Sequence, residues 1–368
     1  MDRLLALARG LLVGLTAAAL YLILVQERMP GDSSALVAAM ARTEAGTGPA
    51  TFWYHLLYAW CARGVDAALP FLAVRTQLEV FAALAGGLAL PLAWLALRRL
   101  GLSNRGAIGA AALLAVTPVL VQHATFVEVH GFQLATGLSA LALVARARDL
   151  GPAGLFATGL VAGLLVNLGH QTGPLLFPGL VLASFWSAGT RALPANWPGR
   201  ALRFGASSAG FVAAIAIARA LTERYSPFEN IRAFSDMADL TAMLVKPVGW
   251  SFLWDELLVG LPVLLVVALV GLPGSLRGTA REDAGEDAAK EPARSAPHHL
   301  AWLGLALVAV PYGFFLFFGE RTEGGYFLGH APGLVLLAGL MLDRRRSWLV
   351  PALLVLASLP LAISLRGA

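Results

Sequence analysis

The chain has 368 residues, of which 58% are hydrophobic and 13% are charged, and its mean hydropathy is +0.72. Soluble globular domains carry about 45–50% apolar and about 25% charged residues, so this composition excludes a water-soluble enzyme and a disordered chain. The formal net charge is +5, and the single cysteine, Cys61, excludes an intrachain disulfide. We therefore predict an all-α, polytopic integral membrane protein.

Eleven apolar segments are candidates for spanning helices, because about 20 mostly apolar residues cross a bilayer. The first, at 5–25, begins with Arg3 and Arg9 and lacks a small-residue cleavage pattern before Gln26, which favours a retained signal anchor. The other ten are predicted at 72–97, 105–122, 127–145, 153–169, 173–189, 202–221, 253–272, 300–318, 326–342 and 347–364.

The basic residues predict the orientation of these spans. They lie mainly at the ends of apolar runs, which indicates membrane topology rather than binding to nucleic acid. Arg and Lys are more numerous in the connections that face the cytoplasm when the N-terminus is inside, so this orientation is expected. The excess of arginine over lysine, together with abundant Ala and Gly, favours a bacterial inner membrane protein.

Two long connections are expected outside, at 26–71 and 222–252, and one long linker of mixed charge inside, at 273–299. Within the first outer loop, residues 51–60 are rich in Trp and Tyr but too few to span. This pattern predicts a helix that lies at the membrane interface.

Ionisable side chains, which the bilayer interior disfavours, mark candidate functional sites. They gather near the predicted outer boundary: Asp32 after the first span, Glu128 and His130 at the start of the fourth, Asn167, His170 and Gln171 at the end of the fifth, Glu320, Arg321 and Glu323 between the ninth and tenth, and Tyr326 and His330 at the start of the tenth. A shared outer cavity is therefore geometrically feasible.

Each group also has a structural interpretation. Asp32 can cap the helix that follows it, and Glu128 and His130 can be interfacial residues wetted by headgroup water. His170 can be a turn histidine with satisfied hydrogen bonds, and Arg321 can pair with a neighbouring glutamate. The sequence has no Walker loop, dinucleotide fingerprint or His/Cys metal quartet, which argues against an ATP-driven transporter and an electron carrier.

Four stretches together resemble the C-type glycosyltransferase superfamily, and within it the bacterial branch similar to protein O-mannosyltransferases. Their order and spacing carry more weight than any single motif. The stretches are Gly31–Ser34 with Pro49 and the aromatic segment after it, Phe126–Gln133, Gly163–Thr172 and Gly325–Pro332.

The resemblance implies a membrane enzyme that transfers a sugar from a polyprenyl-phosphate donor to a lipid, glycan or protein acceptor on the extracytoplasmic face, with inversion. Asp32 would be the base. Arg321, and next Arg224 or Arg232, would bind the lipid phosphate, while Glu128, His130, His170 and Tyr326 would line the substrate pocket. No cofactor is assigned, and a divalent cation stays open. Tyrosine is usual in this family where His130 stands, so the sugar pocket is expected to differ.

The resemblance also divides the chain into a common-type module at 1–222, which contains the outer loop 26–71, and a variable module at 223–368. The second module would contain the outer loop 223–252 and the linker 273–299. Two other functions remain open from the sequence: a non-catalytic membrane assembly protein, and a lipid-sugar flippase or other transporter.

Overall fold

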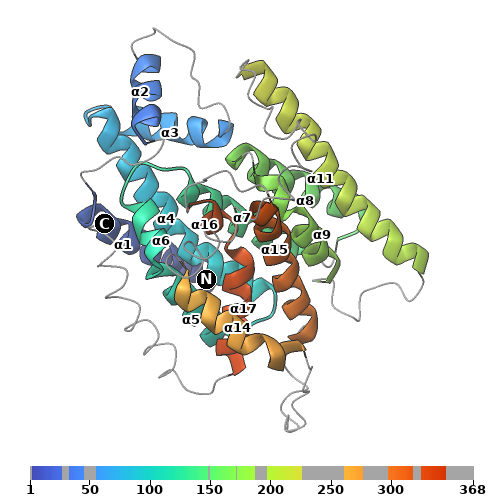
Figure 1. Ribbon diagram of the computed structural model, residues 1–368. Helices are drawn as coiled ribbons and strands as arrows, with labels where there is room; N and C mark the ends of the chain where they lie inside the picture. Colours follow the sequence, from blue (N-terminus) through green and yellow to red (C-terminus); the bar gives the residue numbers. More distant parts are fainter. Residues whose placement is uncertain are drawn as a thin grey trace.

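The structure is a computed structural model that describes residues 2–26, 33–44, 55–147, 150–170, 172–186, 197–225, 261–276, 297–317 and 325–344. Every regular element in these ranges is helical, in agreement with the predicted all-α class (Figure 1). The elements are α1 (Asp2–Ile23), α2 (Ser33–Glu44), α3 (Leu56–Ala68), α4 (Val74–Arg99), α5 (Asn104–Ala115), α6 (Pro118–Ala124), α7 (His130–Ala145), α8 (Pro152–Gly169), the 3₁₀ turn η2 (Gly173–Leu176), α9 (Phe177–Trp186), α11 (Trp197–Tyr225), α14 (Pro262–Leu276), α15 (Pro297–Phe317), α16 (Gly325–Gly329) and α17 (Pro332–Arg344).

Three described helices are long and apolar enough to cross a membrane: Val74–Arg99, Pro152–Gly169 and Pro198–Thr222. A fourth span results if the bent pair α5 and α6 is counted as one. Six further apolar stretches within the described helices, among them Ala8–Ile23 of α1 and His298–Phe314 of α15, have 10–17 residues each. The count of eleven spans therefore stays a prediction, and the segment predicted at 347–364 lies outside the described residues.

Two predicted spans are broken by proline. The segment at 105–122 divides into α5 and α6, which meet at an angle of 63°, and the segment at 326–342 divides into α16 and α17. Pro118 and Pro332 each begin the second helix, where the missing N–H of proline is harmless. The residue before a proline avoids the helical region, and Thr117 has an extended backbone with ψ of 128°. Hydropathy alone does not detect these breaks.

Small residues bring neighbouring helices close together. A Cβ added to Gly87 of α4 would lie 2.3 Å from the carbonyl oxygen of Gly14 in α1. A Cβ on Gly210 of α11 would lie 2.2 Å from the carbonyl oxygen of Phe156 in α8. Such close backbone approach is typical of helix packing in membranes, where van der Waals contact is a main source of association energy.

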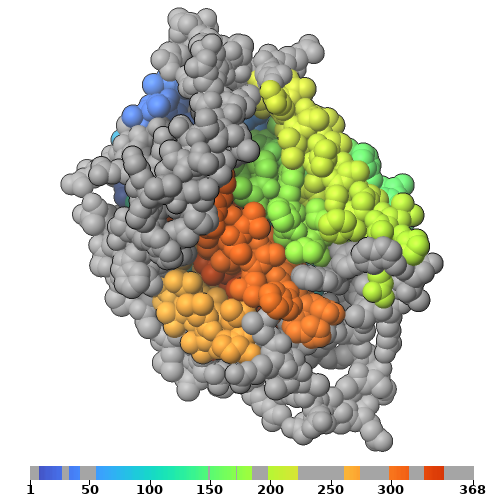
Figure 2. Space-filling model, turned by 45° about the vertical axis from the view of Figure 1, so that its right-hand side comes forward, coloured from blue at the N-terminus to red at the C-terminus, as the bar shows by residue number. Residues whose placement is uncertain are grey.

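The helices at the edge of the bundle expose apolar side chains. In the view of Figure 2, α11, α14 and α15 form much of the surface that the structure describes. Val212 on α11 is 64% exposed, Val270 on α14 is 59% exposed and Trp302 on α15 is 53% exposed. Large apolar side chains on the outside of a bundle of this composition are expected to face lipid.

Helices α2 and α3 cover one end of the bundle, at the top of Figure 1. Tyr58 of α3 is fully buried among Phe81 of α4 and Phe132 of α7. The Gln77 amide of α4 donates to the Asp66 carboxylate and to the backbone after α3, which fixes α3 to α4. The helix expected near 51–60 thus begins at Leu56, and its position at a membrane interface stays a prediction.

Candidate functional site

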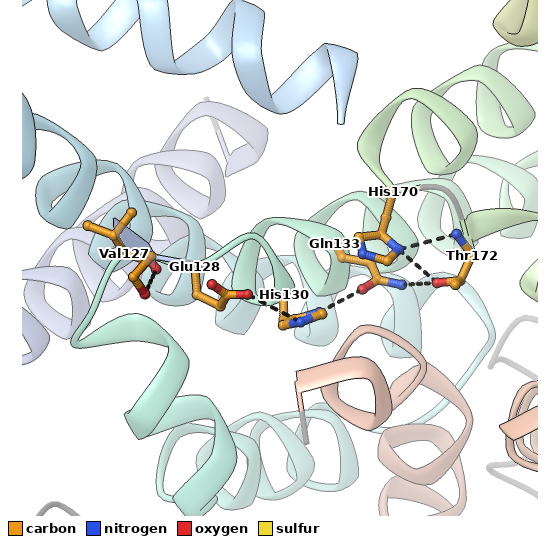
Figure 3. A network of polar contacts seen from close by, with 7 residues as sticks. Val127, Glu128, His130, Gln133, His170 and Thr172 are labelled. Atoms are coloured by element: carbon orange, nitrogen blue, oxygen red, sulfur yellow. Dashed lines mark hydrogen bonds and ion pairs between the residues drawn. The ribbon is translucent and has the colours of Figure 1, made fainter. Parts of the chain in front are cut away.

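A buried polar cluster lies where the N-terminus of α7, the turn after α8 and the turn between α16 and α17 come together (Figure 3). These three places are separated by up to 197 residues in the chain. The side chains of the cluster are between 0% and 4% exposed, and they are Glu128, His130, Gln133, His170, Thr172 and His330. Burying this many polar groups is costly unless they bond to one another.

At the start of α7 the cluster contains an acid, Glu128, two residues before the helix begins. The His130 Nε2 atom lies 3.4 Å from the Glu128 Oε1 atom. The other ring nitrogen of His130, Nδ1, lies 3.2 Å from the Oε1 atom of Gln133. Because residues three apart lie on one face of a helix, Gln133 can reach His130 and continue the network toward the other helices.

Gln133 joins α7 to the two distant turns. Its amide nitrogen donates to the Thr172 hydroxyl at 2.9 Å and lies 3.2 Å from His330 Nε2. The Thr172 oxygen is also 2.8 Å from His170 Nδ1 and 3.0 Å from His330 Nε2. Figure 3 shows the resulting chain of contacts from Glu128 to Thr172. The cluster therefore links the first half of the sequence to its last helices.

Two residues of the segment predicted as the first outer loop lie at this cluster. The ring of His55, directly before α3, stacks on the ring of His170 with 4.4 Å between centroids. Burial raises the pKa of the Tyr58 phenol on α3, and an ionised Glu128 would raise it further. Helix α3 thus covers the polar cluster.

Ser33 connects α2 to the same place. Its hydroxyl is fully buried and donates to the carbonyl oxygen of Val127, the residue before Glu128. Ser33 is the first residue of α2. The residue covalently attached to it, Asp32, lies outside the described residues, as does the predicted capping contact of Asp32.

The structure brings together three of the predicted site residues, Glu128, His130 and His170. Arg321 and Arg232 lie outside the described residues. Tyr326 is on α16 and Arg224 is on α11, and the structure does not describe where their side chains lie. Elsewhere on α4, Arg75 and Glu79, which are four residues apart, form an ion pair with 2.7 Å between Nε and Oε1.

Gln133, Thr172, His55 and Ser33 are not among the predicted site residues, and His330 is predicted only as one of the groups near the outer boundary. A signal was present for Gln133, because it is a polar residue in an apolar helix, three positions after His130. His330 and Thr172 belong to stretches that carry the resemblance, but nothing local indicates that they contact each other.

Among the residues that the structure describes, no three His, Cys, Asp or Glu side chains come together with a geometry that would hold a metal ion. Glu128 and His130 lie together, but no third carboxylate, imidazole or thiolate among these described residues joins them with a metal-binding geometry. These residues do not fit a divalent cation site, so no step below is assigned to a metal.

No protein-family model and no curated protein match the sequence. Solved structures do match its fold. ArnT from Cupriavidus metallidurans bound to undecaprenyl phosphate has a TM-score of 0.64 at 18% identity, over 94% of this chain and 62% of ArnT. This chain thus spans less than two thirds of the length of ArnT.

Two structures from Archaeoglobus fulgidus are similar as well. The oligosaccharyltransferase AglB in complex with an inhibitory peptide and a dolichol-phosphate has a TM-score of 0.56 at 13% identity, over 97% of this chain and 56% of AglB. The oligosaccharyltransferase complex with Zn and sulfate has a TM-score of 0.54 at 14% identity, over 96% and 53% of the two chains. This chain therefore shares its fold with these proteins. Membership of the C-type superfamily stays a prediction. The O-mannosyltransferase-like branch stays a prediction.

Proposed function

We propose that this protein is a membrane glycosyltransferase that transfers a sugar from a polyprenyl-phosphate donor to an extracytoplasmic acceptor. The observation that carries the proposal is the buried cluster of Glu128, His130 and His170 under α3, within a fold that ArnT and AglB share. A bilayer protein rarely retains so many polar side chains without a functional reason.

In this proposal Asp32 is the catalytic base and removes a proton from the acceptor hydroxyl. The hydroxyl oxygen then attacks the anomeric carbon from the side opposite to the phosphate, which inverts the configuration. The Ser33 hydroxyl bonds to the carbonyl oxygen before Glu128. Since Ser33 is the neighbour of Asp32 in the chain, this bond supports a position of the base close to the polar cluster.

The departing phosphate gains negative charge as the bond to the sugar breaks. Guanidinium groups can stabilise that charge through paired hydrogen bonds. We assign this role first to Arg321, which precedes α16 in sequence, and next to Arg224 and Arg232. Glu128, His130, His170 and Tyr326 would contact the sugar and the phosphate. His330, which directly follows α16 (Gly325–Gly329), belongs to the cluster, and this supports the assignment to Arg321.

The direct test supplies purified full-length protein in lipid with radiolabelled polyprenyl-phosphate sugars and candidate lipid, glycan and protein acceptors. The proposal predicts transfer of label, and NMR of the product should show an inverted anomeric centre. A product with retained anomeric configuration would contradict the single displacement. If the protein neither transfers a sugar nor binds a donor, a non-catalytic assembly protein would be favoured.

A separate experiment tests on which side of the membrane the active site lies. Single cysteines at 230–245 and 280–295, introduced after Cys61→Ser, are treated with a membrane-impermeant thiol reagent on intact cells. The predicted topology requires labelling of 230–245 from outside and protection of 280–295. Labelling of 280–295 alone would reverse the topology and place the active site on the cytoplasmic face.

A further inference from the structure

His123 is a buried imidazole to which the proposed function gives no role. It lies one residue before the end of α6, and only 4% of it is exposed. Its Nδ1 atom is buried and has no hydrogen-bond partner among the residues that the structure describes. A buried polar atom without a partner lowers stability. Native proteins retain few such atoms, and each of them requires an explanation.

The ring of His123 packs against two other rings. The centroid of the Phe126 ring lies 5.1 Å away, with an angle of 49° between the ring planes. The centroid of the His130 ring also lies 5.1 Å away, with the planes at 85°. Because His130 belongs to the polar cluster, His123 lies directly beside that cluster.

The backbone around His123 is closely packed as well. Thr125, the residue after α6, accepts hydrogen bonds from the backbone N–H of Gln26 at 2.9 Å and from the Gln26 side-chain amide at 2.8 Å. A Cβ added to Gly86 of α4 would lie 2.6 Å from the Cβ atom of Ala124. The unpaired nitrogen therefore belongs to a well-anchored segment and not to a loosely packed one.

The connection from α6 to α7 also binds the start of α2, where the Ser33 hydroxyl donates to the Val127 carbonyl oxygen. Gln26 and Ser33 thus both bond to residues within four positions of His123 in the chain. Asp32, the proposed base, lies between Gln26 and Ser33 in the sequence. His123 is therefore beside the contacts that flank the proposed base.

The surroundings of His123 indicate the kind of ligand that it would bind. Sites for small ligands combine aromatic or apolar walls with a few polar atoms that fix the orientation of the ligand. A neutral imidazole has one nitrogen that donates and one that accepts, and a hydroxyl group can do either. A hydroxyl therefore fits Nδ1 in both tautomers of the ring, whereas an ionised phosphate oxygen only accepts and fits one.

We propose that His123 is a substrate-binding residue and that its Nδ1 atom forms a hydrogen bond with a hydroxyl group of a sugar substrate. The proposal rests on the proposed function, which brings a sugar to the neighbouring His130. The hydroxyl belongs either to the sugar on the polyprenyl phosphate or to a sugar of a glycan acceptor. A substrate without this hydroxyl would leave the buried nitrogen unpaired, so the site would select against it.

The test measures the binding of radiolabelled undecaprenyl-phosphate glucose, mannose and galactose to full-length protein in lipid nanodiscs. The donor that binds best is then compared with its monodeoxy analogues. The wild type is expected to bind one analogue about tenfold more weakly, which corresponds to the loss of one hydrogen bond. His123→Phe should bind the donor and that analogue equally. His123→Asn, which has a polar atom near the position of Nδ1, should keep part of the preference.

A second measurement identifies the source of the hydroxyl. If it belongs to the acceptor, donor binding is unchanged in His123→Phe, and KM for a glycan acceptor rises about tenfold. Leu120→Met, a buried apolar change on the same helix, is the matched control and should alter neither quantity. A folded His123→Phe protein with wild-type donor preference and wild-type acceptor KM would overturn the proposal.

The thermal stability of the ligand-free protein distinguishes substrate binding from a structural role. His123→Phe and His123→Leu both remove the unpaired nitrogen, so at least one of them should have a Tm equal to or above that of the wild type. A lower Tm in both variants would show that the protein itself supplies the partner of Nδ1, and would overturn the proposal.

The outcomes also separate this proposal from the proposed function. If no sugar is transferred but His123→Phe alters the donor preference, the proposed function fails and the role of His123 stands. If sugar is transferred and His123→Phe alters neither donor preference nor acceptor KM, the role of His123 fails alone. A protein that neither binds a donor nor transfers a sugar would contradict both.

Discussion

Two polar regions at opposite ends of the bundle are built in different ways. Around α5 and the end of α17, polar side chains bond mainly to backbone groups: Ser103 N–H donates to Asp343 Oδ1 at 3.0 Å, and Arg98 and Arg99 donate to the carbonyl oxygens of Leu102 and Ala142. Under α3, side chains bond to one another, as from His130 through Gln133 to Thr172. Contacts of the first kind end helices and fix loops. Contacts of the second kind are expensive to bury and indicate a functional site.

The largest loss of activity is expected when the proposed base, Asp32, is changed. Asp32→Asn should lower the rate of transfer by at least about 10²–10⁴-fold, the usual contribution of a general base. Asparagine keeps the oxygen that caps a helix, so folding should be retained. Transfer rate and thermal stability are measured together. Unchanged turnover in the Asn variant would leave Asp32 as a capping residue only.

Arg321 should have the next largest effect. If it binds the departing phosphate, Arg321→Ala should lower kcat/KM about 10²–10³-fold, and Arg321→Lys should retain part of the activity because lysine offers a point charge without the paired geometry. Donor KM, kcat and thermal stability are compared for both variants. Wild-type kinetics in a folded Arg321→Ala protein would move the phosphate site to Arg224 or Arg232.

The remaining predictions concern contacts between helices that are far apart in the chain, which the sequence alone does not reveal. The apolar class and the helical segments are predictable, because hydropathy and periodicity are local properties. The outer position of Glu128, His130 and His170 stays a prediction. The contacts of Thr172 and His330 are not predictable, since they depend on how helices 158 residues apart pack together. The helix breaks at Pro118 and Pro332 are not predicted either, because a single proline at a helix start hardly lowers the mean hydropathy of the whole segment.

Thr172→Val tests the centre of the polar cluster. Removing the hydroxyl leaves the amide of Gln133 and Nδ1 of His170 each without one partner, at a cost of about 1–3 kcal/mol in stability. Donor KM should also change, because His170 and His330 lose their common contact. Thr172→Ser, which keeps the hydroxyl, should behave as the wild type, and a defect of equal size in Ser would argue against the hydrogen bonds.

Asp343→Ala is the corresponding substitution at the opposite end of the bundle, around α5 and the end of α17. Ser103 N–H loses its acceptor, and stability should fall by about 1 kcal/mol. Activity per folded molecule should stay unchanged, since the hydrogen bonds of Asp343 join it to Ser103 and Arg105 at the start of α5. Thermal unfolding and donor KM are measured on one preparation. A changed KM without a change in stability would show that the two ends are not independent.

The central claim is that a polyprenyl-phosphate binds at the end of the bundle covered by α3. Cross-linking with a polyprenyl phosphate that has a photoreactive group next to the phosphate tests this most directly, with mass spectrometry to identify the modified peptides. The account predicts labels on α3 and on the segments around Glu128 and His170, and competition by unmodified polyprenyl phosphate should remove them. Labels confined to the end formed by α5 and the last turn of α17, or labels that competition does not reduce, would contradict the account.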